Sequence, residues 1–181
     1  MTYITALNLN DADATTVATL NAVKAQIGMI PNLFATLAKS PTALNSLLSI
    51  NDLISKGNLT SSEREIIALA TSQANSCHYC VSAHTLLGKN AGLNAEQMLG
   101  ARAGNGGGGR VKAIAAFTKA VVEQRGHVDS KTLDQFKADG LTEVDFLEII
   151  SNVAATTLTN YTNNISRTEI DFPVVSLQLT A

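Results

Sequence analysis

The class of fold follows most directly from the segment Thr60-Ser61-Ser62-Glu63-Arg64-Glu65-Ile66-Ile67-Ala68-Leu69-Ala70. Thr60, with Glu63 three residues later, forms a capping box, in which two side chains satisfy free backbone N–H groups at a helix start. Apolar residues then recur at the spacing of one buried helical face. The segment predicts a helix over about 61–74 that carries Glu65 in its first turns.

Similar helix signals recur along the chain. Ser40-Pro41 combines an N-cap residue with proline at the first helical position. Alternating Val/Ile/Thr runs, which are typical of strands, do not occur outside the tail, and we expect that tail to be irregular from Ile170 to Pro173. The predicted class is all-α. Besides 61–74, we expect helices from Asp11 or Asp13 to Ile27, then over 31–38, 41–56, 95–102, 111–125, 130–139 and 143–167.

Composition favours one compact domain over residues 1–181. Hydrophobic residues make up 45% of the chain, aromatic residues make up 4%, and tryptophan is absent, so the core must consist largely of Ala, Leu, Ile and Val. The run 104–109, Gly-Asn-Gly-Gly-Gly-Gly, is expected to be a flexible connector within this domain. It lacks the Lys-Ser/Thr ending of a phosphate-binding loop.

The net charge and the N-terminal sequence indicate which kinds of partner the protein does not bind. A formal net charge of -2 and a charged fraction of 15% leave no basic stripe for nucleic acid. The N-terminus has no signal-peptide pattern, and no apolar run approaches the ~20 residues of a membrane span. We therefore expect a cytoplasmic protein that binds neither nucleic acid nor membrane. The two cysteines, Cys77 and Cys80, are too few for a secreted disulfide scaffold.

A short internal echo allows a two-half internal symmetry. Glu65-Ile66-Ile67 matches Glu148-Ile149-Ile150, and each triplet follows a Leu-Thr pair. Counted from these triplets, the positions of the two cysteines correspond to Asn160 and Asn163 in the second copy. Only the first copy could therefore carry thiol chemistry.

The cysteines and a histidine form the main candidate site. Asn75 or Ser76 is expected to cap a helix that runs to about Lys89, and in it Cys77, Cys80 and His84 would share one face at i, i+3 and i+7. If Ser76 is the N-cap, both thiols lie in the first turn. There, free backbone N–H groups and the helix dipole favour the reactive thiolate.

This arrangement suits peroxide reduction. One thiolate attacks the peroxide and becomes a sulfenic acid, and a second thiol nearby condenses with it to a disulfide. A histidine such as His84 is able to accept and donate the protons. In an antiparallel helical hairpin, Glu65 would return towards His84 and orient it. Cys77, as the first thiol of the pair, would be the more exposed nucleophile, whereas proximity to His84 favours Cys80.

The spacing of the candidate residues is Glu65, eleven intervening residues, Cys77-x-x-Cys80, three more residues and His84. This arrangement resembles the motif of the alkylhydroperoxidase D-like (AhpD-like) branch of the carboxymuconolactone decarboxylase superfamily. The upstream segments 30–34 and Ser40-Pro41 are also similar to that family. The resemblance implies an all-helical fold, a homo-oligomer (trimer or hexamer) and reduction of organic hydroperoxides through a disulfide cycle. It assigns peroxide attack to Cys80, resolution to Cys77, proton relay to His84 and completion of the relay to Glu65.

The resemblance also implies partners. The reductant would be a lipoyl-bearing adaptor protein or another dithiol, a peroxiredoxin could be a partner, and no cofactor is expected. One position departs from the better-known members, which carry a second histidine immediately before the second cysteine where this chain has Tyr79. A phenol donates hydrogen bonds but does not accept protons efficiently at neutral pH. We therefore expect Tyr79 to alter the rate and the peroxide preference relative to those members.

Three alternatives stay open at this stage. Two cysteines and His84 provide three zinc ligands, but no fourth ligand is evident, so no metal site is predicted. Both thiols could also be buried core residues of a helical interaction protein without catalysis. Finally, the chain could decarboxylate a lactone, the activity that names the superfamily and needs no thiols.

Overall fold

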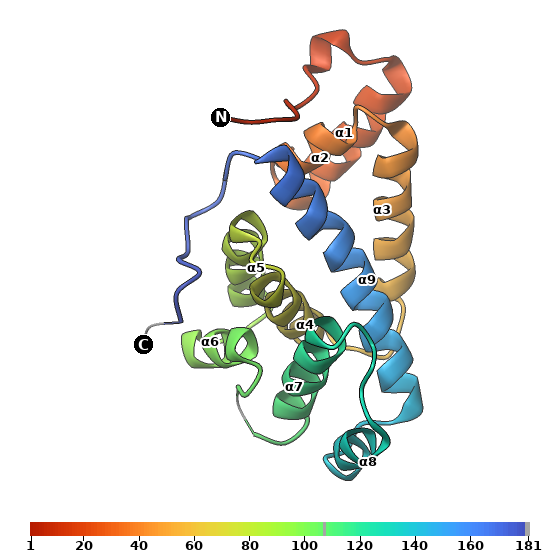
Figure 1. Cartoon of the computed structure of the whole chain (residues 1–181). Coiled ribbons are helices and arrows are strands. Elements are labelled where there is room, and N and C mark those ends of the chain that lie inside the picture. Colours follow the sequence, from red (N-terminus) through yellow and green to blue (C-terminus); the bar gives the residue numbers. More distant parts are fainter. Residues whose placement is uncertain (107, 180–181) are drawn as a thin grey trace.

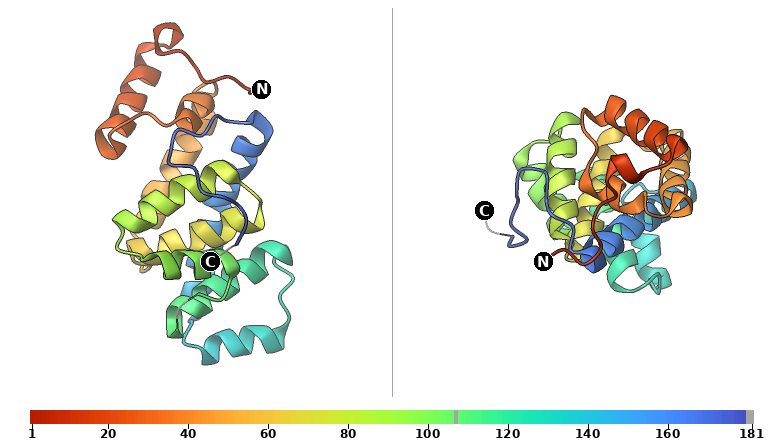
Figure 2. Two further views of the ribbon diagram at one scale, coloured as in Figure 1. Left: turned by 90° about the vertical axis from the view of Figure 1, so that its left-hand side faces the viewer. Right: turned by 90° about the horizontal axis from the view of Figure 1, so that it is seen from above.

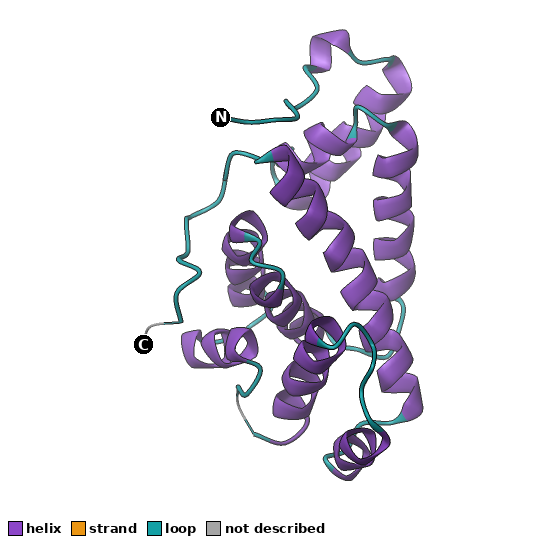
Figure 3. Ribbon diagram, in the orientation of Figure 1, coloured by secondary structure: helices purple, strands orange, loops and turns teal. Residues whose placement is uncertain are grey.

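The computed structural model describes residues 1–106 and 108–179, and every regular element in these residues is helical (Figure 3). The prediction of an all-α fold is confirmed. The described helices are the 3₁₀ helix η1 (Leu9–Asp11) and α1 (Ala14–Ile27), α2 (Asn32–Leu37), α3 (Pro41–Ser55), α4 (Ser61–Ala74), α5 (His78–Asn90), α6 (Ala95–Ala103), α7 (Gly109–Glu123), α8 (Ser130–Ala138) and α9 (Glu143–Ser166).

Local side-chain caps set most helix starts, as predicted. Thr60 accepts a hydrogen bond from the Glu63 backbone, and the Glu63 side chain accepts one from Thr60 N–H, which completes the predicted capping box. At the other end of a helix, Gly28 adopts a left-handed φ of 89° and closes α1. At the starts of other helices, N-cap side chains likewise accept a hydrogen bond from a backbone N–H of the first turn. These residues are Asp13, Ser40, Asn94, Asp129 and Thr142.

The glycine-rich connector is shorter than predicted. Gly109 is the first residue of α7, and Gly107, within the predicted run 104–109, lies outside the described residues. Gly106 is buried, and a Cβ atom added to Gly100 on α6 would lie 2.1 Å from the Cα atom of Gly106. Two glycines are needed here because the backbone of this part of the connector packs directly against α6.

Helix α4 lies in the middle of the bundle and contacts α5, α6, α7 and α9 (Figure 1). Its side chains Ile66, Ile67 and Leu69 are fully buried. The helices α1–α3 form one end of the molecule, and α7 and α8 form the other (Figure 2). Apolar packing on α4 therefore organises the helices around it.

The core consists of two clusters of buried side chains. One cluster joins α4, α6, α7, α8 and α9, and in it the rings of Phe117 and Phe136 meet edge to face at 5.3 Å. The other joins α1, α2, α3 and α5 and includes Cys77, Tyr79 and Cys80. The cysteine pair thus lies within a hydrophobic core.

The apolar spacing over 143–167 predicts that Phe146, Ile149, Ile150 and Val153 share the buried face of α9. Ile149 and Val153 are buried, but Ile150 is 44% exposed. Adjacent residues of a helix point about 100° apart, so Ile150 turns away from the face that packs on α4. In addition, α9 is continuous, whereas the first copy of the echo is interrupted between α4 and α5.

The C-terminal segment crosses the bundle beside α5 and α6 without regular structure, as predicted for residues 170–173 (Figure 1). Ser82 Oγ accepts a hydrogen bond from Val175 N–H, and Arg102 and Gln73 donate to the carbonyls of Ser176 and Leu177. These bonds fasten the segment to the protein. None of the described helices combines the length and apolar character of a membrane span.

An ion-pair cluster joins the starts of α4 and α9 to α7. The Arg110 guanidinium on α7 donates to Glu63 Oε1 at 2.7 Å and to both carboxylate oxygens of Asp145. The hydrogen bond from Arg110 holds the pKa of Asp145 well below its usual range. A carboxyl whose folded-state pKa is depressed stabilises the protein above the unfolded-state pKa of about 4, and this contribution is lost as the pH falls.

We expect Arg110→Met to lower the free energy of unfolding at neutral pH by about 2 kcal/mol, because it leaves the buried Asp145 carboxylate unpaired while solvent screens part of the loss. The difference from the native chain should shrink as the pH falls below about 4. Urea unfolding over a pH series measures both effects. Lys137→Met, which removes an exposed ion pair to Glu143, is the control and should change little. A constant difference between Arg110→Met and native protein at every pH would contradict the prediction.

Candidate active site

The chain reverses between α4 and α5, and this reversal positions the cysteines. Ser76 has a left-handed φ of 52°, and Cys77 N–H donates to the Ser72 carbonyl at 2.9 Å. Cys77 has the extended backbone of an N-cap, and its sulfur accepts a hydrogen bond from Cys80 N–H at 3.3 Å. The predicted cap at Asn75 or Ser76 is therefore wrong, since Cys77 itself caps α5 and only Cys80 lies in the first turn.

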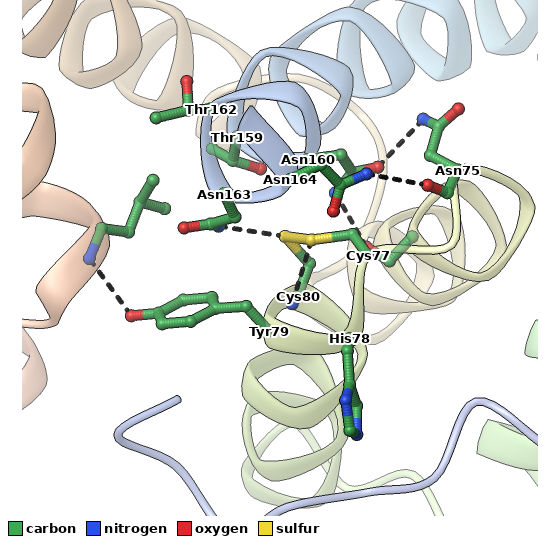
Figure 4. The surroundings of a disulfide bond; sticks show 12 residues. Asn75, Cys77, His78, Tyr79, Cys80, Thr159, Asn160, Thr162, Asn163 and Asn164 are labelled. Carbon is green, nitrogen blue, oxygen red and sulfur yellow. Dashed lines mark hydrogen bonds between the residues drawn. A yellow bond between two sulfur atoms is a disulfide. The ribbon is translucent and has the colours of Figure 1, made fainter. Parts of the chain in front are cut away.

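Cys77 and Cys80 are joined by a disulfide, with their Cα atoms 5.3 Å apart (Figure 4). Both residues are buried, Cys77 completely and Cys80 to within 2%. The pair therefore has the proximity that a thiol–disulfide cycle requires.

His84 and Glu65 meet across the antiparallel packing of α5 and α4. His84 Nδ1 lies 2.8 Å from Glu65 Oε2, and both side chains are about one-fifth exposed. The contact that the sequence suggested between these residues is present in the structure. Because the carboxylate is an acceptor, it favours the proton on Nδ1 and leaves Nε2 free to exchange protons.

A cavity of about 290 Å³ brings these groups together. Cys80, His84 and Glu65 all line it, whereas Cys77 does not. The remaining wall is largely apolar and comes from α1 to α5, α9 and the C-terminal segment. It includes Ile27, Leu33, Phe34, Leu47, Ile54, Ala155 and Phe172. An apolar molecule in this cavity would meet Cys80 and the histidine–carboxylate pair at one place.

Tyr79, which departs from the family pattern, is held by contacts with α2 and with the C-terminal segment. Its hydroxyl accepts a hydrogen bond at 3.3 Å from Leu33 N–H, in the first turn of α2. Its ring packs edge-on against Phe172, with centroids 5.5 Å apart. Burial and the neighbouring Asp171 raise the pKa of Tyr79 well above its usual range. Tyr79 thus stays neutral and does not replace a histidine as a proton acceptor.

Asn163 on α9 is a site residue that the sequence did not single out for chemistry. Its side-chain Nδ2 donates to Cys80 Sγ at 3.3 Å, and the residue is 3% exposed (Figure 4). The sequence echo, which aligned Asn163 with Cys80, was the only signal that pointed to this position. Phe172 was likewise missed, because nothing local indicates that the tail forms a cavity wall.

The alternative zinc site gains no further ligand from the fold. Within residues 1–106 and 108–179, no cluster of three or more His, Cys, Asp or Glu side chains could hold a metal ion. His78 points away from the disulfide (Figure 4), and His84 is paired with Glu65.

Comparison with known proteins agrees with this geometry. The sequence model of the carboxymuconolactone decarboxylase family matches residues 41–121, a segment that contains Glu65, both cysteines and His84. No curated protein matches the chain.

Solved structures with the same fold include a peroxidase-related protein from Ralstonia eutropha JMP134, described as an alkylhydroperoxidase AhpD core. It is 25% identical with a TM-score of 0.81, covering 91% of this chain and 89% of that one. The debrominase Bmp8 bound to 2,3,4-tribromopyrrole is 20% identical with a TM-score of 0.79, covering 94% and 92%. A peroxidase-related protein from Silicibacter sp. TM1040 is 21% identical with a TM-score of 0.78, covering 92% and 91%. The chain is therefore similar in fold to proteins of more than one described activity.

We expect Tyr79→Phe to lower the free energy of unfolding by about 1 to 2 kcal/mol, because it removes the acceptor of a buried backbone N–H at the start of α2. Denaturant unfolding monitored by circular dichroism measures the change. Tyr161→Phe, at a tyrosine that is 55% exposed on α9, is the matched control. Equal effects of the two substitutions would show that the Tyr79 hydroxyl contributes nothing to stability.

Proposed function

We propose that this chain, whose residues 41–121 match the sequence model of the carboxymuconolactone decarboxylase family, is a thiol-dependent peroxidase that reduces organic hydroperoxides. One observation carries the proposal: Cys80 and the His84–Glu65 pair line the same apolar cavity, and Cys77 is within disulfide distance behind it. The likeness in fold to a peroxidase-related protein supports it.

In the first step of the proposed cycle, the Cys80 thiolate attacks the terminal oxygen of the hydroperoxide. The S–O bond forms as the O–O bond breaks, and the leaving alkoxide takes a proton from His84 to become an alcohol. Cys80 becomes a sulfenic acid and is thereby oxidised by two electrons. Glu65 keeps the imidazole oriented through the contact at Nδ1.

In the second step, the Cys77 thiol attacks the Cys80 sulfur. Water leaves, and the disulfide seen in the structure forms. A dithiol then supplies two electrons and two protons to restore both thiols and becomes a disulfide itself. Cys80 is our assignment for the peroxide-reactive residue because it lines the cavity, whereas Cys77 does not.

For the reductant we propose a lipoyl-bearing protein or another dithiol, on the strength of the resemblance to the alkylhydroperoxidase D-like branch, with a peroxiredoxin as a further candidate partner. A reducing cytoplasm would supply such dithiols. We also propose a homo-oligomer, whose order, trimer or hexamer, rests on the same resemblance. Self-association is supported by large apolar side chains that are exposed along α9, namely Val144, Leu147, Tyr161 and Ile165.

Separate cysteine variants test the assignment. With an organic hydroperoxide and dihydrolipoamide, the native chain should turn over and Cys80→Ser should not. With the hydroperoxide alone, Cys77→Ser should react once and retain a sulfenic acid on Cys80. Peroxide consumption and mass spectrometry of a dimedone adduct provide the two readouts. Equal rates for native protein and Cys80→Ser would rule out the proposal. Decay of a muconolactone by a chain with both cysteines changed to serine would instead indicate lactone decarboxylation.

The proposed proton relay has its own test. We expect His84→Gln to lower kcat/KM for the hydroperoxide by about 100-fold or more, since positioned acid–base groups contribute on this scale. Glu65→Gln should cost about 10-fold, because the imidazole stays in place but loses the carboxylate that orients it. Steady-state kinetics with Glu96→Gln, at an exposed glutamate on α6, is the control. Native rates in both relay variants would exclude these two residues from the reaction.

A further inference from the structure

Asn163 makes a single polar side-chain contact in the described part of the chain. Its Nδ2 donates to Cys80 Sγ at 3.3 Å. Its other polar atom, Oδ1, is fully buried and has no hydrogen-bond partner. The residue itself is 97% buried, because its exposed fraction is 3%. The amide group is thus held in the core by its contact with the sulfur.

Such an arrangement is costly while the sulfur is part of a disulfide. A bonded sulfur is a weak acceptor, and a buried amide with one weak bond and one unpaired oxygen loses more from leaving water than it gains. A thiolate is different, because a hydrogen bond to an ionised acceptor is roughly twice as strong as one between neutral groups. The Asn163 side chain is therefore better matched to reduced, ionised Cys80 than to the disulfide.

Asn160 lies one turn earlier on α9 and shows what a structural asparagine looks like at this interface. It donates to Ser72 Oγ at 3.2 Å and accepts from Asn75 Nδ2 at 3.0 Å (Figure 4). Both polar atoms of its side chain are thereby satisfied, and neither bond involves sulfur. The difference between the two asparagines argues that Asn163 is not simply a packing residue.

The charges around Cys80 come from other helices. Arg64 and Glu65 on α4 and His84 on α5 line the same cavity, and Tyr79 is the remaining titratable group there. Helix α9 carries no charged residue over 149–166, and α1, α2 and α3 contribute no charged side chain to the cavity. Helix α9 thus brings no charge to the sulfur, and the contact that it makes there is the hydrogen bond from the Asn163 amide.

We propose that Asn163 stabilises the thiolate of Cys80, by donating an N–H hydrogen bond to Sγ in the reduced protein, and so readies this sulfur for attack. The proposal rests on the proposed peroxidase function, in which Cys80 is the nucleophile. The amide does not react, and it gains and loses no proton. Its role is to favour the ionised thiol and to fix the position of its sulfur against α9.

The test titrates the single thiol of Cys77→Ser protein by thiolate ultraviolet absorbance over a range of pH, without any peroxide. Asn163→Leu, which keeps the size of the side chain but removes the donor, should raise the pKa of the Cys80 thiol by about one unit. Asn163→Asp, which keeps the shape and adds a negative charge, should raise it further. Asn160→Leu is the matched control and should leave the thiol titration unchanged. Circular dichroism establishes that each variant is folded.

Unchanged titration of Cys80 in Asn163→Leu would overturn the proposal, and so would an equal shift in Asn160→Leu and Asn163→Leu. If Asn163→Leu does not fold, the smaller Asn163→Ala, which removes the donor without adding a charge, decides alone. The measurement is also independent of the peroxidase assay. If Asn163→Leu raises the pKa of the Cys80 thiol but the native chain reduces no hydroperoxide, the role of Asn163 is sustained and the peroxidase function is refuted. If the native chain reduces the hydroperoxide but Asn163→Leu leaves the pKa of the thiol unchanged, the peroxidase function is sustained and the role of Asn163 is refuted.

Discussion

The reversal of the chain between α4 and α5 is the constraint on which the site depends. With Ser76 in a left-handed conformation and Cys77 N–H bonded to the Ser72 carbonyl, α4 ends and a new helix starts at the first cysteine. The same reversal makes the helices antiparallel, so residues nineteen positions apart, Glu65 and His84, come into contact. Had α4 continued, the cysteines would lie in a helix interior, without free N–H groups nearby.

Helix α9 supplies the other half of the environment. It packs along α4 and α5, and its uncharged stretch leaves the sulfur facing amides and small side chains rather than ions. Cys80 therefore lines a cavity in which α4 and α5 provide charged groups, namely Arg64, Glu65 and His84, while α9 provides neutral ones. In a low-dielectric interior, a single oriented dipole on α9 has a larger effect than it would in water.

Most of the fold could be predicted because its helix boundaries depend on local bonds. The capping box at Thr60 and the glycine after α1 act within a few residues, and the sequence displays them directly. The start of α5 was missed, since a left-handed serine next to several polar residues leaves no distinct pattern. The contact of Asn163 with Cys80 spans 83 positions and depends on how α9 rotates about its axis, which periodicity fixes only roughly, as exposed Ile150 illustrates.

The segment that matches the family sequence model, 41–121, contains the two cysteines, Glu65 and His84. It begins after α1 and α2 and ends before α9. Much of the cavity wall, including Leu33, Ala155 and Phe172, comes from outside this segment. The two cysteines, Glu65 and His84 are thus encoded in one segment of the gene, whereas the cavity wall is encoded partly by that segment and partly by the sequences on either side of it. Exchanging the flanking parts between proteins of this fold would therefore replace part of the cavity wall and Asn163, while the two cysteines, Glu65 and His84 would stay in place.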